Sequence, residues 1–292
     1  GGKTQLINEL EQFFPTELRS GGIRKYAEPF IGGGAVFFTI AQKYPTIESY
    51  FLSDINEELI LAYRTIQRDV ESVIYLLKKL EEKYYTLDET EQKDFYYNLR
   101  SAFNNKRTYI DFSSFNDDWI ERTASIIFLN RTCYNGLFRV NSNGNFNVPF
   151  GDYKNPRICD QDNLLAVSKL LKKAEIVCGD FTISESFIDE NTFVYFDPPY
   201  RPISKTSNFT SYSRFDFDEK EQIRLANYFN TLSQKGAKLM LSNSDPKNEN
   251  PNDDFFENLY KGFRINRIEA LRMINCNGNR RGKIKELVIT NY

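Results

Sequence analysis

Histidine is absent from this sequence of 292 residues, and cysteine is scarce. Without histidine the chain cannot form a Ser-His-Asp or Cys-His catalytic site, or a metal centre built on imidazoles. The four cysteines are widely separated and form no Cys-x-x-Cys pair. We therefore expect reduced thiols in a cytoplasmic protein and no metal site.

The sequence also lacks long apolar runs and a strong charge of one sign. No run approaches the ~20 residues of a membrane span, and no signal-peptide pattern opens the chain, so we expect no membrane association. The absence of an initiator methionine leads us to expect residues upstream of Gly1. Although the formal net charge is −2, residues 261–285 contain eight basic residues and one acid. This local excess suits a polyanion, or a solvated charged surface.

The chain is organised around residues 192–200. Residues 192–196 are all β-branched or aromatic and predict a buried strand. Pro198 and Pro199 cannot donate to a sheet, so the strand ends at Asp197, at an edge where α/β proteins bind ligands. The Asp197 carboxylate, a rigid carbonyl and the Tyr200 ring suit a planar group that carries an NH2. An Asp-Pro pair is also a common way to open a turn.

A glycine turn near the N-terminus predicts a second part of the same site. A short strand leads into Gly32-Gly33-Gly34 and then into an apolar helix, and residues 50–54 predict another strand that ends in Asp54. An acid about 20 residues beyond such a turn is typical of Rossmann-like nucleotide sites. NAD would also fit, although contiguous glycines depart from Gly-x-Gly-x-x-Gly. Lys3, after two glycines, is predicted beside this site at a helix N-terminus.

The middle of the chain has a different character. Residues 57 to about 125 have helical periodicity, which indicates a helical domain inserted between strands. Segments 137–140 and 146–148 then predict a β-hairpin around an Asn- and Gly-rich turn. Such a ribbon can enter a DNA major groove, although most polar hairpins are plain surface structure. Further on, Asp180 ends a predicted strand and Phe181 follows it, a pair able to bond and stack against adenine.

Three of these motifs resemble those of the Dam-type DNA adenine methyltransferases (class D12, alpha group). They are the Glu-Pro-Phe-x-Gly-Gly-Gly turn, the hairpin region 131–151 and the Asp-Pro-Pro-Tyr segment, and the similarity covers nearly the whole chain. The resemblance implies an α/β fold with a Rossmann-like S-adenosylmethionine-dependent methyltransferase sheet. Residues 1–56 and 166–292 would form this catalytic domain. Residues 57–165 would form a mainly helical target-recognition domain that carries the hairpin.

The resemblance also implies roles for individual residues. The catalytic residues would be Asp197, Pro198, Pro199 and Tyr200. The cofactor-binding residues would be Lys3, Glu28, Pro29, Phe30, Gly32, Gly33, Gly34, Asp54, Asp180, Phe181 and Asp197. The DNA-binding residues would be Arg131, Tyr134, Asn135, Leu137, Arg139, Asn147 and Pro149.

The function implied is transfer of a methyl group from S-adenosylmethionine to N6 of adenine in double-stranded DNA, with GATC as the leading target. Base flipping and direct displacement would carry it out. We expect a monomer of bacterial or phage origin, with a cognate restriction endonuclease left open as a partner. Methylation of cytosine N4 and a catalytically inactive DNA-binding protein remain alternatives. Methylation of cytosine C5 is disfavoured because no cysteine lies in the Asp-Pro-Pro-Tyr segment.

Overall fold

The chain divides into two compact units. The computed structural model describes residues 6–141, 143–201, 217–271 and 283–292. One unit contains the chain up to Ile55 and nearly all of it from Lys173 onward, and the other spans Asn56–Lys172. The sequence-based boundaries lay at 57 and 165. The assignment of the second unit to DNA recognition stays a prediction.

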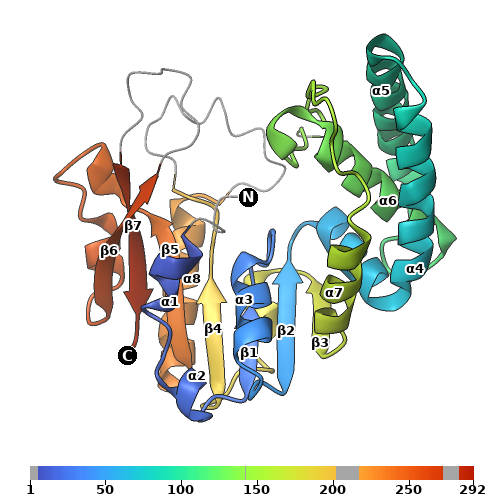
Figure 1. Cartoon of the computed structure of the whole chain (residues 1–292). Coiled ribbons are helices and arrows are strands. Elements are labelled where there is room, and N and C mark those ends of the chain that lie inside the picture. The colour runs from blue at the N-terminus through green and yellow to red at the C-terminus, as the bar shows by residue number, and fades with distance from the viewer. Residues whose placement is uncertain (1–5, 142, 202–216, 272–282) are drawn as a thin grey trace. The chain divides into compact units, whose positions relative to one another are not determined.

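The first unit is built on a mixed sheet. Within the described residues, seven strands form one sheet in the order β3-β2-β1-β4-β5-β7-β6 (Figure 1). Neighbouring strands from β3 through β5 are parallel, and β7 runs antiparallel to both β5 and β6. The strands are β1 (Lys25–Glu28), β2 (Ser49–Asp54), β3 (Ala174–Cys178), β4 (Thr192–Phe196), β5 (Lys238–Ser244), β6 (Arg264–Leu271) and β7 (Lys283–Thr290).

Helices cover both faces of this sheet, which is why its central strands are almost continuously hydrophobic. On one face, Val194 and Phe196 belong to a buried cluster that includes side chains of α8 (Glu219–Gln234) and α9 (Phe255–Leu259). On the other face, the Phe193 ring lies 5.6 Å from that of Phe14, and Tyr50 lies 5.3 Å from Phe37 of α3 (Ala35–Lys43). The predicted α/β class is therefore correct.

The second unit is mainly helical. Its long helices are α4 (Glu57–Tyr85), α5 (Glu89–Lys106), α6 (Asp117–Thr132) and α7 (Gln161–Leu171). Asn56 caps α4 by accepting from two backbone N–H groups, and Asp88 with Glu91 forms a capping box on α5. A buried ion pair joins α4 to α6, because Arg122 donates to both carboxylate oxygens of Glu58. The helical character expected for residues 57–125 is confirmed.

Two details differ from the sequence-based expectations. The apolar residues among positions 7–14 are spaced as on one face of a helix and predict a helix that stops at Pro15. The structure has a shorter helix, α1 (Ile7–Glu11), followed by turns and by a short α2 (Glu17–Ser20). Strand β6 was not predicted, because the charged residues Arg264, Arg267 and Glu269 break up its apolar pattern. No helix in the described part of the chain combines the length and apolar character needed to cross a membrane.

Candidate active site

The predicted catalytic and cofactor segments meet at one edge of the sheet. The glycine turn follows β1, Asp54 ends β2, Asp180 follows β3 and Asp197 follows β4. These four strands are parallel neighbours, so their carboxyl ends lie at the same edge (Figure 1). The strand order reverses between β1 and β4, and ligands bind at such a switch point in open α/β sheets.

The glycine turn is tied to the end of β2. The Gly32 N–H donates to Asp54 Oδ2 at 3.0 Å. Gly32 and Gly34 have φ angles of 45° and 69°, a region that side chains disfavour, whereas a Cβ on Gly33 would have no protein atom within 4 Å. The turn therefore holds Asp54 in place and leaves open space above Gly33.

Glu28 is the last residue of β1, the strand that leads into this turn. Its side chain is buried, and Tyr26 donates its hydroxyl proton to Glu28 Oε2 at 2.6 Å. Burial raises the pKa of Glu28 well above its usual range, although the Tyr26 hydrogen bond acts in the opposite direction. The negative charges of Asp197 and Asp54 raise the pKa of Glu28 in the same direction as burial does.

Asp180 is held by a group that the sequence did not suggest. Arg224 of α8 donates to Asp180 Oδ1 at 2.8 Å and to Oδ2 at 2.5 Å, and Thr182 donates to Oδ1 through its backbone N–H and its hydroxyl. The Arg224 guanidinium also lies over the buried Phe181 ring, 4.1 Å from its centroid. The hydrogen bond from Arg224 contributes most to lowering the pKa of Asp180 to about 2, and the bonds from Thr182 add to it. The carboxylate therefore stays ionised.

The Asp-Pro-Pro-Tyr segment is anchored by three other elements. Gln222 of α8 donates to the Pro199 carbonyl at 3.0 Å, and the Tyr200 hydroxyl donates to Glu286 of β7 at 2.9 Å. Ser242 of β5 donates to Asp197 Oδ1 at 3.2 Å. Pro198 is buried, whereas the Tyr200 side chain is 43% exposed, as a stacking ring requires.

The predicted DNA-contacting residues lie on the surface of the helical unit. The Tyr134 side chain is 57% exposed and that of Leu137 is 42% exposed. The Arg139 Nε donates to Asn147 Oδ1 at 2.8 Å, which gives the guanidinium a set direction. The remaining members of the predicted set, Arg131, Asn135 and Pro149, are also exposed.

The hairpin has the predicted turn but not two regular strands. Asn141 N–H donates to the Asn145 carbonyl at 2.9 Å, and the N–H of Gly144 donates to the Asn141 carbonyl at 2.8 Å. Beyond this turn, the described residues of region 131–151 form isolated bridges between Val140 and Phe146 and between Cys133 and Phe150 rather than a continuous ladder. The exposed residues of the first arm bury little surface, so a long ladder is not stabilised.

Part of the predicted site lies outside the described residues. This applies to Lys3, and in the basic segment 261–285 to Arg272, Arg280 and Arg281. Within the same segment, Arg267 donates to Asp245 at 2.7 Å and also pairs with Glu257. Its charge is therefore neutralised locally and contributes less to attraction of a polyanion than the sequence suggested.

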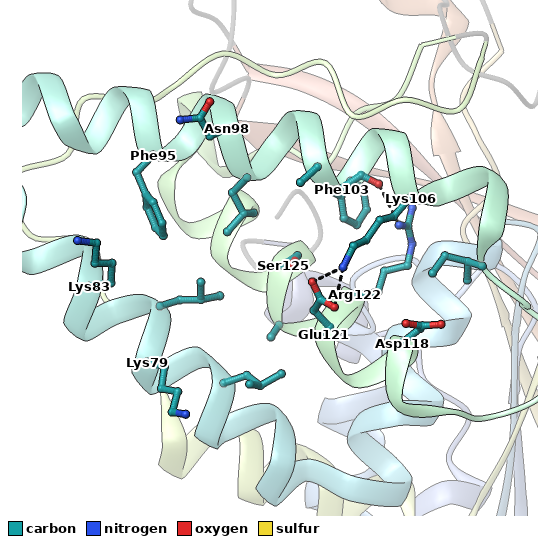
Figure 2. Close-up of a pocket in the computed structure, with 16 residues that line it drawn as sticks. Lys79, Lys83, Phe95, Asn98, Phe103, Lys106, Asp118, Glu121, Arg122 and Ser125 are labelled. Atoms are coloured by element: carbon teal, nitrogen blue, oxygen red, sulfur yellow. Dashed lines mark hydrogen bonds and ion pairs between the residues drawn. The ribbon is translucent and has the colours of Figure 1, made fainter.

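Two further observations concern possible ligands. Among the described residues, no group of three or more His, Cys, Asp or Glu side chains could hold a metal ion. In the helical unit, a groove of about 490 Å³ lies between α4, α5 and α6, with the Lys106–Glu121 ion pair at one end (Figure 2). None of the predicted site residues lines this groove.

Sheet order and the four carboxyl-edge segments are consistent with the class of S-adenosylmethionine-dependent methyltransferases. Residues 1–274 match the family model of D12 class N6 adenine-specific DNA methyltransferases. The chain belongs to this family and is a site-specific adenine DNA methyltransferase, as the resemblance implied. Membership of this family implies S-adenosylmethionine as methyl donor and DNA as substrate.

The sequences of named relatives align with this chain over almost its full length. The chain is 51% identical to the type II methyltransferase M.MjaIII of Methanocaldococcus jannaschii, over 100% of this chain and 96% of the relative. It is 39% identical to the type II methyltransferase M1.LlaDCHI of Lactococcus lactis subsp. cremoris, over 100% and 93%. It is 31% identical to a DNA adenine methylase of Vibrio cholerae, over 99% and 92%. These similarities do not favour cytosine-N4 methylation or an inactive DNA-binding protein.

Proposed function

We propose that this enzyme methylates adenine N6 within GATC in double-stranded DNA, after the target base has flipped out of the duplex. The observation that carries the proposal is the anchored Asp-Pro-Pro-Tyr segment at the carboxyl end of β4. An exocyclic amino group cannot meet a methyl donor while its base is stacked and paired, which is the reason for base flipping.

The segment supplies an acceptor pair and a ring. Asp197 and the Pro198 carbonyl would accept the two N–H bonds of the adenine amino group, and Tyr200 would stack on the base. These two hydrogen bonds from the amino group direct the nitrogen lone pair away from the two acceptors. Orientation of this kind contributes up to ~7–11 kcal/mol in favourable intramolecular reactions. No histidine is needed for this chemistry.

The chain's residues also fit the methyl donor. S-adenosylmethionine, when bound, supplies a methyl group on a positively charged sulfur. The open space above Gly33 admits a ligand close to the backbone, and the Asp54 carboxylate suits ribose hydroxyls. Asp180 Oδ1 accepts three hydrogen bonds, from Arg224 and twice from Thr182, whereas Oδ2 accepts one from Arg224, so Oδ2 is the better acceptor for an adenine amino group.

Recognition of the DNA sequence is assigned to the helical unit. Arg139, with Leu137 and Pro149, would contact base edges, and Arg131, Tyr134, Asn135 and Asn147 would hold the backbone or the distorted base pair. Arginine contacts guanine through two hydrogen bonds in the major groove, which suits a site that begins with G.

Incubation with labelled S-adenosylmethionine and a duplex that contains one GATC site, followed by nucleoside analysis, tests the proposal. We expect label in N6-methyladenine, and none when GATC is altered at the target adenine. Asp197→Ala should lower turnover by orders of magnitude while cofactor and DNA affinities change far less.

A matched variant separates this from misfolding. Asp189→Ala removes another carboxylate next to β4, which accepts from Lys25 and Thr192 at the opposite edge of the sheet. It should leave turnover unchanged. Label in cytosine, or full turnover by a stable Asp197→Ala protein, would contradict the proposal.

The remaining expectations belong to this proposal as well. Because two relatives are named type II methyltransferases, a cognate restriction endonuclease is the partner to look for. Genomic DNA methylated by this enzyme should resist cleavage by such an endonuclease. A cytoplasmic monomer stays our expectation for its state in the cell, and sedimentation tests the oligomeric part.

A further inference from the structure

Beneath the predicted catalytic carboxylate lies a short chain of buried hydroxyl groups. Side chains alternate along a strand, so Tyr195 and Asp197 point to the same side of β4. The pairing of Phe196 with Leu241 in the parallel neighbour β5 puts Ser242 on that side too. The Tyr195 hydroxyl lies 2.7 Å from Ser242 Oγ, and Ser242 Oγ donates to Asp197 Oδ1 at 3.2 Å.

The direction of this chain follows from counting protons. Ser242 has a single hydroxyl proton, which it gives to Asp197, so the Tyr195 hydroxyl is the donor in the bond to Ser242. Tyr195 and Ser242 both have 0% of their surface exposed, which leaves water no room to take over either bond. Consecutive hydrogen bonds in a buried setting polarise and strengthen one another.

We propose that Ser242 and Tyr195 are positioning residues for the methyl transfer. They hold the Asp197 carboxylate at the angle needed to accept a hydrogen bond from the substrate amino group. The inference rests on the proposed role of Asp197. Neither residue touches the substrate. Ser242 acts directly on the carboxylate and Tyr195 acts through Ser242. This chain of hydrogen bonds restricts rotation of the Asp197 carboxylate to one orientation, and catalysis by orientation requires such a restriction.

The prediction is a graded effect on turnover alone. Ser242→Ala should lower kcat by ~10- to 100-fold with little change in either KM, the pattern of an interaction that matters in the transition state. Tyr195→Phe, which keeps the ring and removes only the donor, should lower kcat by a smaller factor, ~3- to 10-fold. Ser242→Thr retains the hydroxyl and should recover most of the activity.

Thr192→Val is the matched control. Thr192 is a fully buried residue of the same strand whose hydroxyl donates to Asp189 Oδ1 at 3.0 Å, at the opposite edge of the sheet. It should lose thermal stability to a similar degree as Ser242→Ala and keep the kcat of the parent enzyme. Cofactor affinity, measured by calorimetry, should be unchanged in all four variants.

The outcomes separate this inference from the proposed function. If the parent enzyme does not form N6-methyladenine, the proposed function fails. If it does, and kcat is unchanged in a folded Ser242→Ala or Tyr195→Phe protein, only the positioning role is overturned. A loss of kcat that Thr192→Val reproduces also overturns it. Should Ser242→Ala not fold, the isosteric Tyr195→Phe variant decides the question.

Discussion

Arg224 donates a hydrogen bond to each oxygen of the Asp180 carboxylate, with N–O distances of 2.8 and 2.5 Å. The two side chains are about 40% exposed, at 42% and 39%, so water and salt screen the pair. Its main consequence is orientation: a planar fork fixes a planar carboxylate more firmly than a single hydrogen bond would. The pair connects α8 to the turn after β3.

The first prediction concerns acid stability. The folded-state pKa of Asp180, about 2, lies below the usual ~3.9, so the stabilisation is complete above about pH 4 and is lost as pH falls toward 2. The melting temperature of Arg224→Ala should therefore be lower than that of the parent at pH 7, and the gap should close between pH 4 and 2. Melting curves across this range are the measurement. A gap that stays constant would contradict the prediction.

The second prediction concerns the glycine turn. A side chain at Gly33 meets no protein atom within 4 Å, so Gly33→Val should fold normally yet occupy the proposed ligand space. We expect affinity for S-adenosylmethionine to fall at least about tenfold, ~1.4 kcal/mol, by calorimetry. Gly33→Ala should have a smaller effect. Unchanged affinity in a folded Gly33→Val protein would remove this turn from the cofactor site.

The third prediction concerns sequence discrimination. If Arg139 contacts a guanine through two hydrogen bonds, Arg139→Ala should lose ~1–3 kcal/mol of discrimination at one base pair. Asn147→Ala, which removes the acceptor for Arg139 Nε, should produce a weaker version of the same loss. Competition binding with single-base variants of GATC is the measurement. An equal loss for every sequence would identify Arg139 as a phosphate contact.

A contrasting variant sharpens that test. Lys261 and Lys285 belong to the basic segment, where charges should act on the DNA backbone without regard to sequence. Replacing either by Ala should weaken binding to all duplexes equally and reduce the salt dependence by about one phosphate contact. If these variants changed sequence preference instead, the division of roles would be wrong.

The fourth prediction concerns stability of the helical unit. Arg122 and Glu58 are both buried, and Arg122 also donates to the Phe103 carbonyl at 3.0 Å. Arg122→Ala leaves a carboxylate with a weakened set of partners in the interior, so we expect a loss of about 3–5 kcal/mol of unfolding free energy. The exposed pair Lys106–Glu121 is the control, because Lys106→Ala should cost less than ~1 kcal/mol. Urea denaturation distinguishes the two.

Much of the fold was predictable because its strands are sharply marked. Residues 192–196 are all β-branched or aromatic, and β4 has these bounds. By contrast, Ile265 and Ile268 of β6 are three positions apart, which departs from the period of two expected for a strand. The hairpin was predicted with two regular strands that the structure does not have, for a related reason. Turn residues determine where the chain reverses, but a ladder of paired strands also needs side chains that become buried.

The amino-acid sequence by itself determined the motifs, the helical character of the inserted segment and the family. The three glycines and the rigid Asp-Pro-Pro-Tyr carry conformational demands in their own covalent structure, so they are recognisable without a fold. Only the tertiary structure decided which residues hold these motifs. The residues that hold them lie 23 to 86 positions further along the chain than the residue each one contacts, and they are Arg224, Gln222, Ser242 and Glu286. Strand pairing and helix packing bring them together, and no local pattern encodes that proximity.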